Sequence, residues 1–175
     1  LSAIDYFAWT VEQPGLYGSA AESKYAEKEL RDFCVSLASE AADGVRIGLI
    51  YTKRAHSSDR AVDLLHEIRA IGNGVNPGTD VAVLARTVEA VLLLMRFQKY
   101  QEALLLLEDI GKQVRYGGRD IIYGVIRRGV ATAALFLGRH SEAETAFQDS
   151  LAVFRRYDLP VSTAITLHDL AILKK

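Results

Sequence analysis

The sequence predicts an all-α fold, a stack of antiparallel helical hairpins. The first observation is a repeated pattern, a polar or acidic turn followed by an alanine that opens an apolar helix, at 58–65, 100–107 and 140–147. The alanines of this pattern, Ala61, Ala103 and Ala143, lie 42 and 40 positions apart. A fixed period in this range is typical of stacked hairpins, none of which can bury its apolar face alone. The second observation is that no segment shows the period-two alternation of a half-buried strand.

The composition allows a single folded domain, which we place at 1–175. The chain has 175 residues, half of them hydrophobic, which is enough for one compact domain or one short solenoid and argues against disorder. Its 21 basic and 22 acidic side chains leave a net charge of −1. That balance gives no long-range attraction to nucleic acid or to an anionic membrane. We therefore do not expect this segment to bind nucleic acid.

The cysteine count and the apolar stretches bear on the compartment. A single cysteine, Cys34, excludes an internal disulfide framework. The longest apolar stretch, 88–97, is interrupted by Glu89 and Arg96 and is too short to span a membrane. No basic segment followed by an apolar one opens the chain. We expect a cytoplasmic protein without membrane contact, and, because the chain begins at Leu1, a piece of a longer protein.

A divergent helical pair is expected at 1–44. Apolar side chains recur at helical spacing over residues 1–11. Ser19, with Glu22 three residues later, predicts a capping box for a second helix that ends near Ala42.

The first full repeat is expected at 45–78. Residues 45–55 are interpreted as a helix, because the next segment repeats the hairpin pattern; a short β-branched strand is the alternative. Ser58 is expected to cap a helix over 59–71. The glycine- and asparagine-rich stretch 72–78 is the strongest loop signal in the chain.

The second repeat, 79–118, begins with a cap at Thr79 or Asp80 for a helix over 81–97. A turn then leads into a helix over 100–115.

The third repeat is expected at 119–159. Asp120 is expected to cap its first helix and Gly138 to end it. Ser141, with Glu144 three residues later, predicts a capping box for its second helix.

Residues 160–175 are expected to be the unpaired start of a further repeat. Their helix, 161–173, has an apolar face that includes Ile165, Leu167 and Ile172. This face either packs back on the preceding hairpin or meets more protein, and a second copy or further repeats could attach there.

The spacing within the hairpins resembles the tetratricopeptide repeat family over 45–157. In that family a small residue of the first helix marks the helix crossing, and the second helix opens with an alanine about twelve positions later. Gly48, Val91 and Ala131 precede Ala61, Ala103 and Ala143 by thirteen, twelve and twelve positions. The period of about forty exceeds the family's thirty-four and is similar to the long-repeat type found in bacterial multidomain transcriptional regulators.

This resemblance implies a right-handed α-α superhelix of about nine helices. It also implies a non-catalytic protein- or peptide-binding module, the sensor or interaction part of a regulator that controls an attached DNA-binding or ATPase module. A second resemblance, to the helical-repeat arms of proteasome-lid subunits, implies the alternative of a structural scaffold arm in a large assembly.

By the same resemblance, the first helix of each hairpin lines a concave groove for a protein or peptide partner. Carried over by position, the groove residues are Leu49, Thr52, Lys53, Ala85, Val88, Leu92, Met95, Arg96, Val125, Arg128, Thr132, Leu135 and Phe136. This set is apolar and basic, so the expected ligand is a peptide or helix with an apolar anchor and acidic character. The alternative is that several of these side chains pack between adjacent hairpins.

Nothing in the sequence predicts catalysis, a cofactor or a metal site. Gly72, Gly74 and Gly78 lack the Lys-Ser/Thr ending of a phosphate loop and follow a helix. The histidines are scattered at His56, His66, His140 and His168, without metal-ligand spacing.

Two charged features stand apart from this pattern. Glu89 lies within an apolar run and is expected either to face the groove or to pair with Arg86 or Arg96. A basic and aromatic neighbourhood, 115–119 with Arg127 and Arg128, could contact nucleic acid, but the neutral net charge argues against it.

Overall fold

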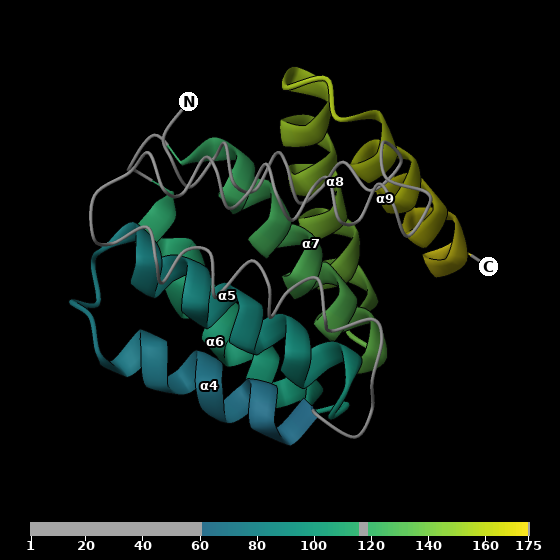
Figure 1. Ribbon diagram of the computed structural model, residues 1–175. Coiled ribbons are helices and arrows are strands. Elements are labelled where there is room, and N and C mark those ends of the chain that lie inside the picture. The colour runs from purple at the N-terminus through teal and green to yellow at the C-terminus, as the bar shows by residue number, and fades with distance from the viewer. Residues whose placement is uncertain (1–60, 116–118, 175) are drawn as a thin grey trace, which may run out of the picture.

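In the computed structural model, residues 61–115 and 119–174 are described, and all of their regular structure is helical (Figure 1). The helices are α4 (Ala61–Asn73), α5 (Asp80–Met95), α6 (Tyr100–Val114), α7 (Asp120–Phe136), α8 (His140–Arg156) and α9 (Pro160–Leu173). The all-α class is confirmed for this part of the chain. The helices expected before residue 61, and the strand alternative for 45–55, lie outside the described residues.

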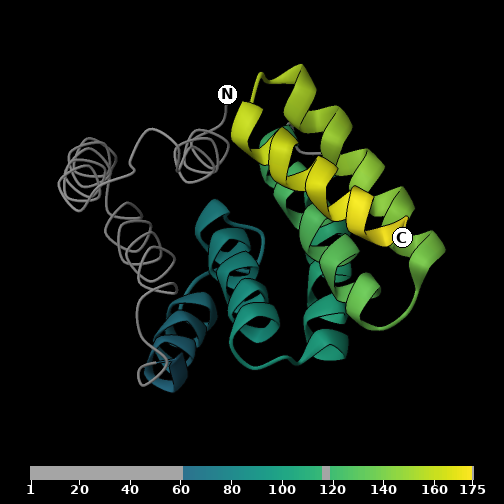
Figure 2. The same ribbon diagram turned by 90° about the vertical axis from the view of Figure 1, so that its right-hand side faces the viewer.

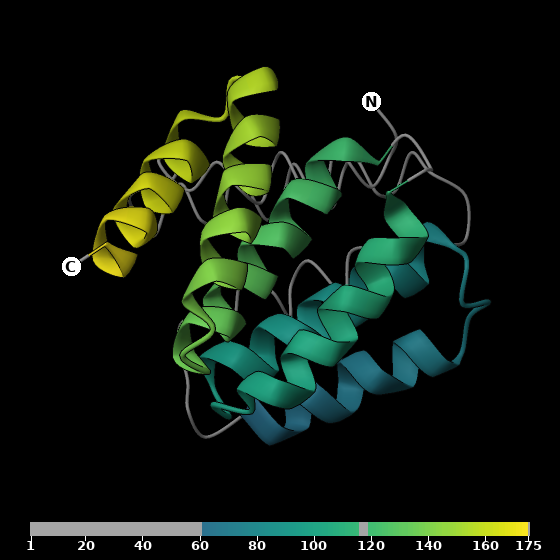
Figure 3. The same ribbon diagram turned by 180° about the vertical axis from the view of Figure 1, so that it is seen from behind.

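Successive helices pack side by side in chain order. Each helix from α4 to α8 contacts the next one along the chain, and α5 also contacts α7, as α7 contacts α9 (Figure 2). Figure 1 shows α5 in front of α6, and Figure 3 shows the reverse face with α6 in front of α5. The hairpins α5/α6 and α7/α8 therefore lie next to each other, with α9 packed on the second.

The repeated alanines occupy close helix contacts. Ala103 and Ala143 are fully buried near the starts of α6 and α8, and Ala61 is buried at the start of α4. An alanine at this position lets one helix approach its partner closely without loss of helix propensity. The period read from the sequence thus corresponds to a packing position.

The largest side chains of the core come from the faces where these helices meet. The fully buried ones are Phe147, Phe154, Ile68, Leu92, Leu93, Leu104, Leu107, Ile110, Ile121 and Ile126. They belong to one continuous cluster that runs through all the hairpins, so each hairpin completes the core of its neighbour.

Helix starts differ from the predicted caps. The Thr79 cap is confirmed, since its Oγ1 accepts a hydrogen bond from the backbone N–H of Ala82 at 3.3 Å. The Ser141 capping box is wrong, because α8 begins one residue earlier, after Arg139, which makes no side-chain cap. Asp120 is likewise the first residue of α7 and not its cap. The carboxylate of Asp120 instead accepts a hydrogen bond from the Tyr157 hydroxyl at 2.7 Å.

The turns inside the two hairpins each contain one residue with positive φ. Gln98 and Gly138 both have positive φ, 53° and 73°. After each of them the chain folds back onto the end of the first helix: the N–H of Lys99 donates to the Leu93 carbonyl at 3.0 Å, and that of Arg139 to the Ala134 carbonyl at 2.8 Å. Gly138 ends α7 as predicted.

Ion pairs repeat with the hairpins. Within each hairpin, an arginine of the first helix reaches an aspartate of the second: Arg86 binds Asp109 at 2.5 Å and Arg127 binds Asp149 at 2.8 Å. Between hairpins, the aspartate at the start of α5 pairs with an arginine just before α7, and the aspartate at the start of α7 pairs with an arginine shortly before α9. These pairs are Asp80 with Arg119 and Asp120 with Arg156.

Candidate functional site

Part of the predicted groove is core. Ala85, Val88 and Leu92 of α5 and Val125 of α7 are buried among their helical neighbours. Side chains that are removed from the surface cannot contact a partner, so at these positions the alternative of packing between hairpins holds. The groove positions of the first hairpin (Leu49, Thr52 and Lys53) lie outside the described residues.

Two predicted groove residues are prominently exposed. Met95 and Phe136 end α5 and α7, the first helices of successive hairpins, and are 66% and 61% exposed. The Phe136 ring stacks on Tyr100, the first residue of α6, with ring centroids 4.6 Å apart and an interplanar angle of 10°. Arg139 also reaches Gln101 across the two tips, with its Nη2 at 2.9 Å from Oε1. The two hairpin tips therefore lie together.

We call Met95, Tyr100 and Phe136 the tip patch. Its two most exposed members are the last residues of α5 and α7, the first helices of consecutive hairpins. Exposed apolar side chains that gather on one part of a surface are a common mark of a binding site.

The remaining groove residues are half-buried. The Arg128 guanidinium lies over the Phe154 ring, 5.4 Å from its centroid, and thus packs α7 against α8. The Thr132 hydroxyl donates to the Arg128 carbonyl at 2.9 Å. Leu135 packs against the core, and Arg96 is the residue that follows α5. These residues contribute to packing as well as to surface.

Glu89 is ion-paired, but not with either expected partner. Arg69 of α4 donates from Nε to the Glu89 carboxylate at 2.6 Å and from Nη2 to Glu102 at 3.2 Å. The hydrogen bond to Glu89 is the largest cause that raises the pKa of Arg69 above its usual value. Arg86 binds Asp109 instead. Spacing along α5 could not predict this ion pair, because Arg69 belongs to the preceding hairpin.

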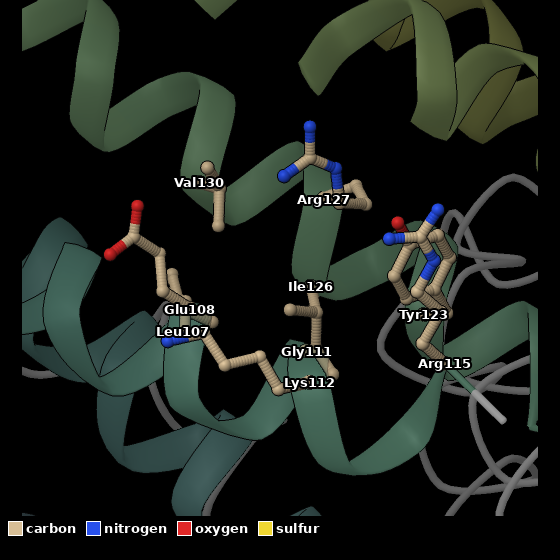
Figure 4. A pocket seen from close by; sticks show the side chains of 9 residues that line it. All are labelled: Leu107, Glu108, Gly111, Lys112, Arg115, Tyr123, Ile126, Arg127 and Val130. Atoms are coloured by element: carbon tan, nitrogen blue, oxygen red, sulfur yellow. The ribbon is translucent and has the colours of Figure 1, made fainter. Parts of the chain in front are cut away.

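A shallow cleft of about 290 Å³ lies between α6 and α7 (Figure 4). Leu107, Ile126 and Val130 form its base, and their side chains are almost fully buried. Gly111 lies beside them and contributes no side chain.

The rim of the cleft carries more positive than negative charge. Lys112 and Arg115 extend from α6, Arg127 from α7, and Glu108 is the acidic member. Arg127 is held by Asp149 of α8, with its Nε at 2.9 Å from Oδ2. The half-buried ring of Tyr123 completes the wall. Of these residues, only Arg115 and Arg127 belong to the basic and aromatic neighbourhood noted in the sequence. The sequence signal that could have indicated the cleft is Gly111, a glycine in the interior of α6.

The last helix, α9, has apolar residues on its exposed side as well as on the side that packs against the core. Its fully buried residues are Ser162 and Thr166, whereas Ile165, Leu167 and Ile172 are exposed. Ile165 and Ile172 are seven residues apart and lie on the same side of the helix, and we call these two residues the α9 face; Leu167 lies on another side. Exposed apolar side chains together with buried Ser162 and Thr166 depart from the usual amphipathic pattern of a surface helix.

Within 61–115 and 119–174, no three His, Cys, Asp or Glu side chains gather as they would around a metal ion. None of α4 to α9 has the length and apolar character that a bilayer crossing requires.

The comparisons with known proteins add no relative to this picture. The chain matches no protein-family model, no curated protein and no solved structure. The described residues combine exposed apolar side chains with charged groups held in ion pairs, and these are the elements of a binding surface.

Proposed function

We propose that this chain is a non-catalytic protein- or peptide-binding helical repeat module, the sensor or interaction part of a larger bacterial regulatory protein. The observation that carries the proposal is the tip patch. Met95 and Phe136 were predicted from position to face a partner, and both are large, apolar and exposed at the ends of α5 and α7, the first helices of two consecutive hairpins. A peptide that follows the stack would meet one anchor point per hairpin.

The same proposal includes a tetratricopeptide-like superhelix of about nine helices that extends over the whole chain. It is supported by the repetition of contacts from one hairpin to the next. The buried alanines, the positive-φ turns and the Arg–Asp pairs each recur with the period of the sequence.

A random peptide library displayed on phage and selected against the full 175-residue chain tests the proposal. Isothermal titration then compares selected peptides on the wild type and on the double variant Met95→Ser/Phe136→Ser. Loss of the two anchors should weaken binding about tenfold or more, because a few buried apolar contacts supply most of the energy of such interfaces.

The matched control is Leu105→Ser. Leu105 is 58% exposed on α6 and is not a member of the tip patch, and its replacement should leave peptide affinity unchanged. Circular dichroism establishes that each variant is folded. Failure to select any peptide, or equal affinity for the wild type and the double variant, would exclude the tip patch as a peptide-binding surface.

The alternative function, a structural scaffold arm, is favoured by the α9 face. An exposed apolar stripe on a packed helix suits permanent contact with another helix, either of further repeats or of a second copy. The variant Ile165→Lys/Ile172→Lys separates the two functions in the same assay. If selected peptides lose affinity for this variant and keep it for the tip variant, the scaffold function is the better description.

A further inference from the structure

We propose that the cleft between α6 and α7 binds an acidic peptide segment through one apolar side chain, at a site separate from the tip patch. This inference rests on the proposed peptide-binding function and deepens it by assigning a second site with its own ligand chemistry. The cleft is formed only when two consecutive hairpins meet, since α6 and α7 belong to different hairpins.

The glycine at the cleft, Gly111, is the first feature that supports this site. A glycine in a helix interior costs about 0.5–1 kcal/mol relative to alanine, so it is usually retained for a packing reason. At Gly124 and Gly129 that reason exists, because a Cβ would come within 2.8 Å of Val153 and 2.9 Å of Leu107. At Gly111 it does not: a Cβ would lie 3.6 Å from Ile126 Cγ2, at ordinary contact distance.

Gly111 therefore does not serve the contact between α6 and α7. Its missing side chain leaves open space above the buried base of the cleft, next to the ring of Tyr123 (Figure 4). With about 290 Å³, the cleft lies at the lower end of the size range of ligand pockets. It accommodates a single apolar side chain and not a helix.

The positive charge of the rim is the second feature that supports this site. Three cationic side chains, Lys112, Arg115 and Arg127, surround the cleft, against the one carboxylate of Glu108. Asp149 binds Arg127 at 2.8 Å and balances its charge, so the excess of positive charge at the rim comes from Lys112 and Arg115. A peptide with carboxylates on either side of an apolar anchor would place its charges near Lys112 and Arg115, which complement it electrostatically.

The test is an NMR titration of the full chain, in which amide shifts report where a peptide binds. The probe is the blocked peptide EELEE, with EESEE and KKLKK as references. We expect EELEE to shift the amides around Gly111 and Ile126, with a Kd of about 1 mM as befits a small contact. EESEE, which lacks the anchor, and KKLKK, which reverses the charge, should each bind about fivefold or more weakly.

Two variants probe the cleft without disturbing the fold. Gly111→Ala places a methyl group in the cleft while it raises helix propensity, and should weaken EELEE binding about threefold or more. Lys112→Glu should weaken EELEE about two- to fivefold and strengthen KKLKK. The matched control is Lys174→Glu, the same charge change after the end of α9, which should alter neither.

The outcomes distinguish this site from the proposed function. Unshifted amides around Gly111, equal binding of KKLKK, or full affinity in Gly111→Ala would each overturn the cleft proposal. The tip variant Met95→Ser/Phe136→Ser should bind EELEE as the wild type does; if it loses binding, the peptide occupies the tip patch and not the cleft. Selection of library peptides at the tips can succeed or fail independently of these results.

Discussion

Helix-interior glycines have two different roles in this molecule. Gly124 lies where α7 crosses α8, against Val153 and the ring of Phe154. Gly111 lies at an open cleft with room for a larger residue. The residue type is the same, but the space around the missing Cβ decides whether glycine is required.

This difference predicts opposite effects for one substitution. Gly124→Ala would place a Cβ 2.8 Å from Val153 Cγ1 and 3.1 Å from Phe154 Cε1. Overpacking of this kind costs about 1–3 kcal/mol, which exceeds the helix-propensity gain of about 1 kcal/mol. We expect a net loss of about 1 kcal/mol in the free energy of unfolding, measured by urea denaturation.

Gly111→Ala is the internal control for that measurement. Here only the propensity gain applies, so the free energy of unfolding should rise by about 0.5–1 kcal/mol. In the background Val153→Ala, the cost of Gly124→Ala should fall, because the closest atom, Val153 Cγ1, is gone. A Gly124→Ala variant as stable as the wild type would show that α7 and α8 adjust freely at this crossing.

At the scale of the element, hairpin turns follow from local chemistry more closely than helix caps do. Gly138 ended α7 as the sequence predicted, because glycine adopts positive φ without strain. The Ser141 capping box failed because the chain enters α8 one residue earlier, through Arg139. The tight fold-back of the turn onto Ala134 sets this entry, and a local capping pattern does not contain that information.

The equivalent turn of the α5/α6 hairpin has Gln98 where glycine would fit better. Gln98 has φ 53°, a conformation that costs a non-glycine residue about 1 kcal/mol. Gln98→Gly should therefore raise the free energy of unfolding by about 0.5 kcal/mol after the added entropy of the unfolded chain. Chemical denaturation measures the change.

The reverse substitution in the other hairpin completes the comparison. Gly138→Ala should lower the free energy of unfolding by about 1 kcal/mol, since its φ is 73° and space around it is open. If both substitutions leave stability unchanged, the positive-φ turns do not limit the stability of the hairpins.

At the scale of the whole molecule, the described helices differ in how many neighbours they pack against. In a stack of repeats, a helix between two neighbours is held more firmly than a helix with one. Helix α7 contacts α5, α6, α8 and α9, whereas α9 packs on α8 and, less extensively, on α7. Only Ser162 and Thr166 of α9 are fully enclosed.

Hydrogen exchange followed by mass spectrometry should therefore show a gradient along the chain. We expect amides of α9 to exchange at least about tenfold faster than those of α7, because local opening of α9 exposes little buried surface. Equal protection of α7 and α9 would mean that the described helices unfold as one cooperative unit.

The sequence alone determined the helical class, the period and the approximate bounds of α5 to α9. These properties depend on local patterns: apolar spacing, glycine and proline at breaks, and an alanine at each repeated contact. The bounds agree within about two residues, as expected where only neighbouring residues decide where a helix begins and ends.

The tertiary structure alone decided which candidate residues reach the surface. Position within a repeat placed Leu92 and Met95 on one predicted groove, yet Leu92 is buried and Met95 exposed. Arg69 pairs with Glu89 across hairpins, and the cleft exists only where α6 meets α7. Burial, cross-hairpin pairing and cavities depend on residues far apart in sequence, and helical periodicity specifies a face of a helix but not what covers it.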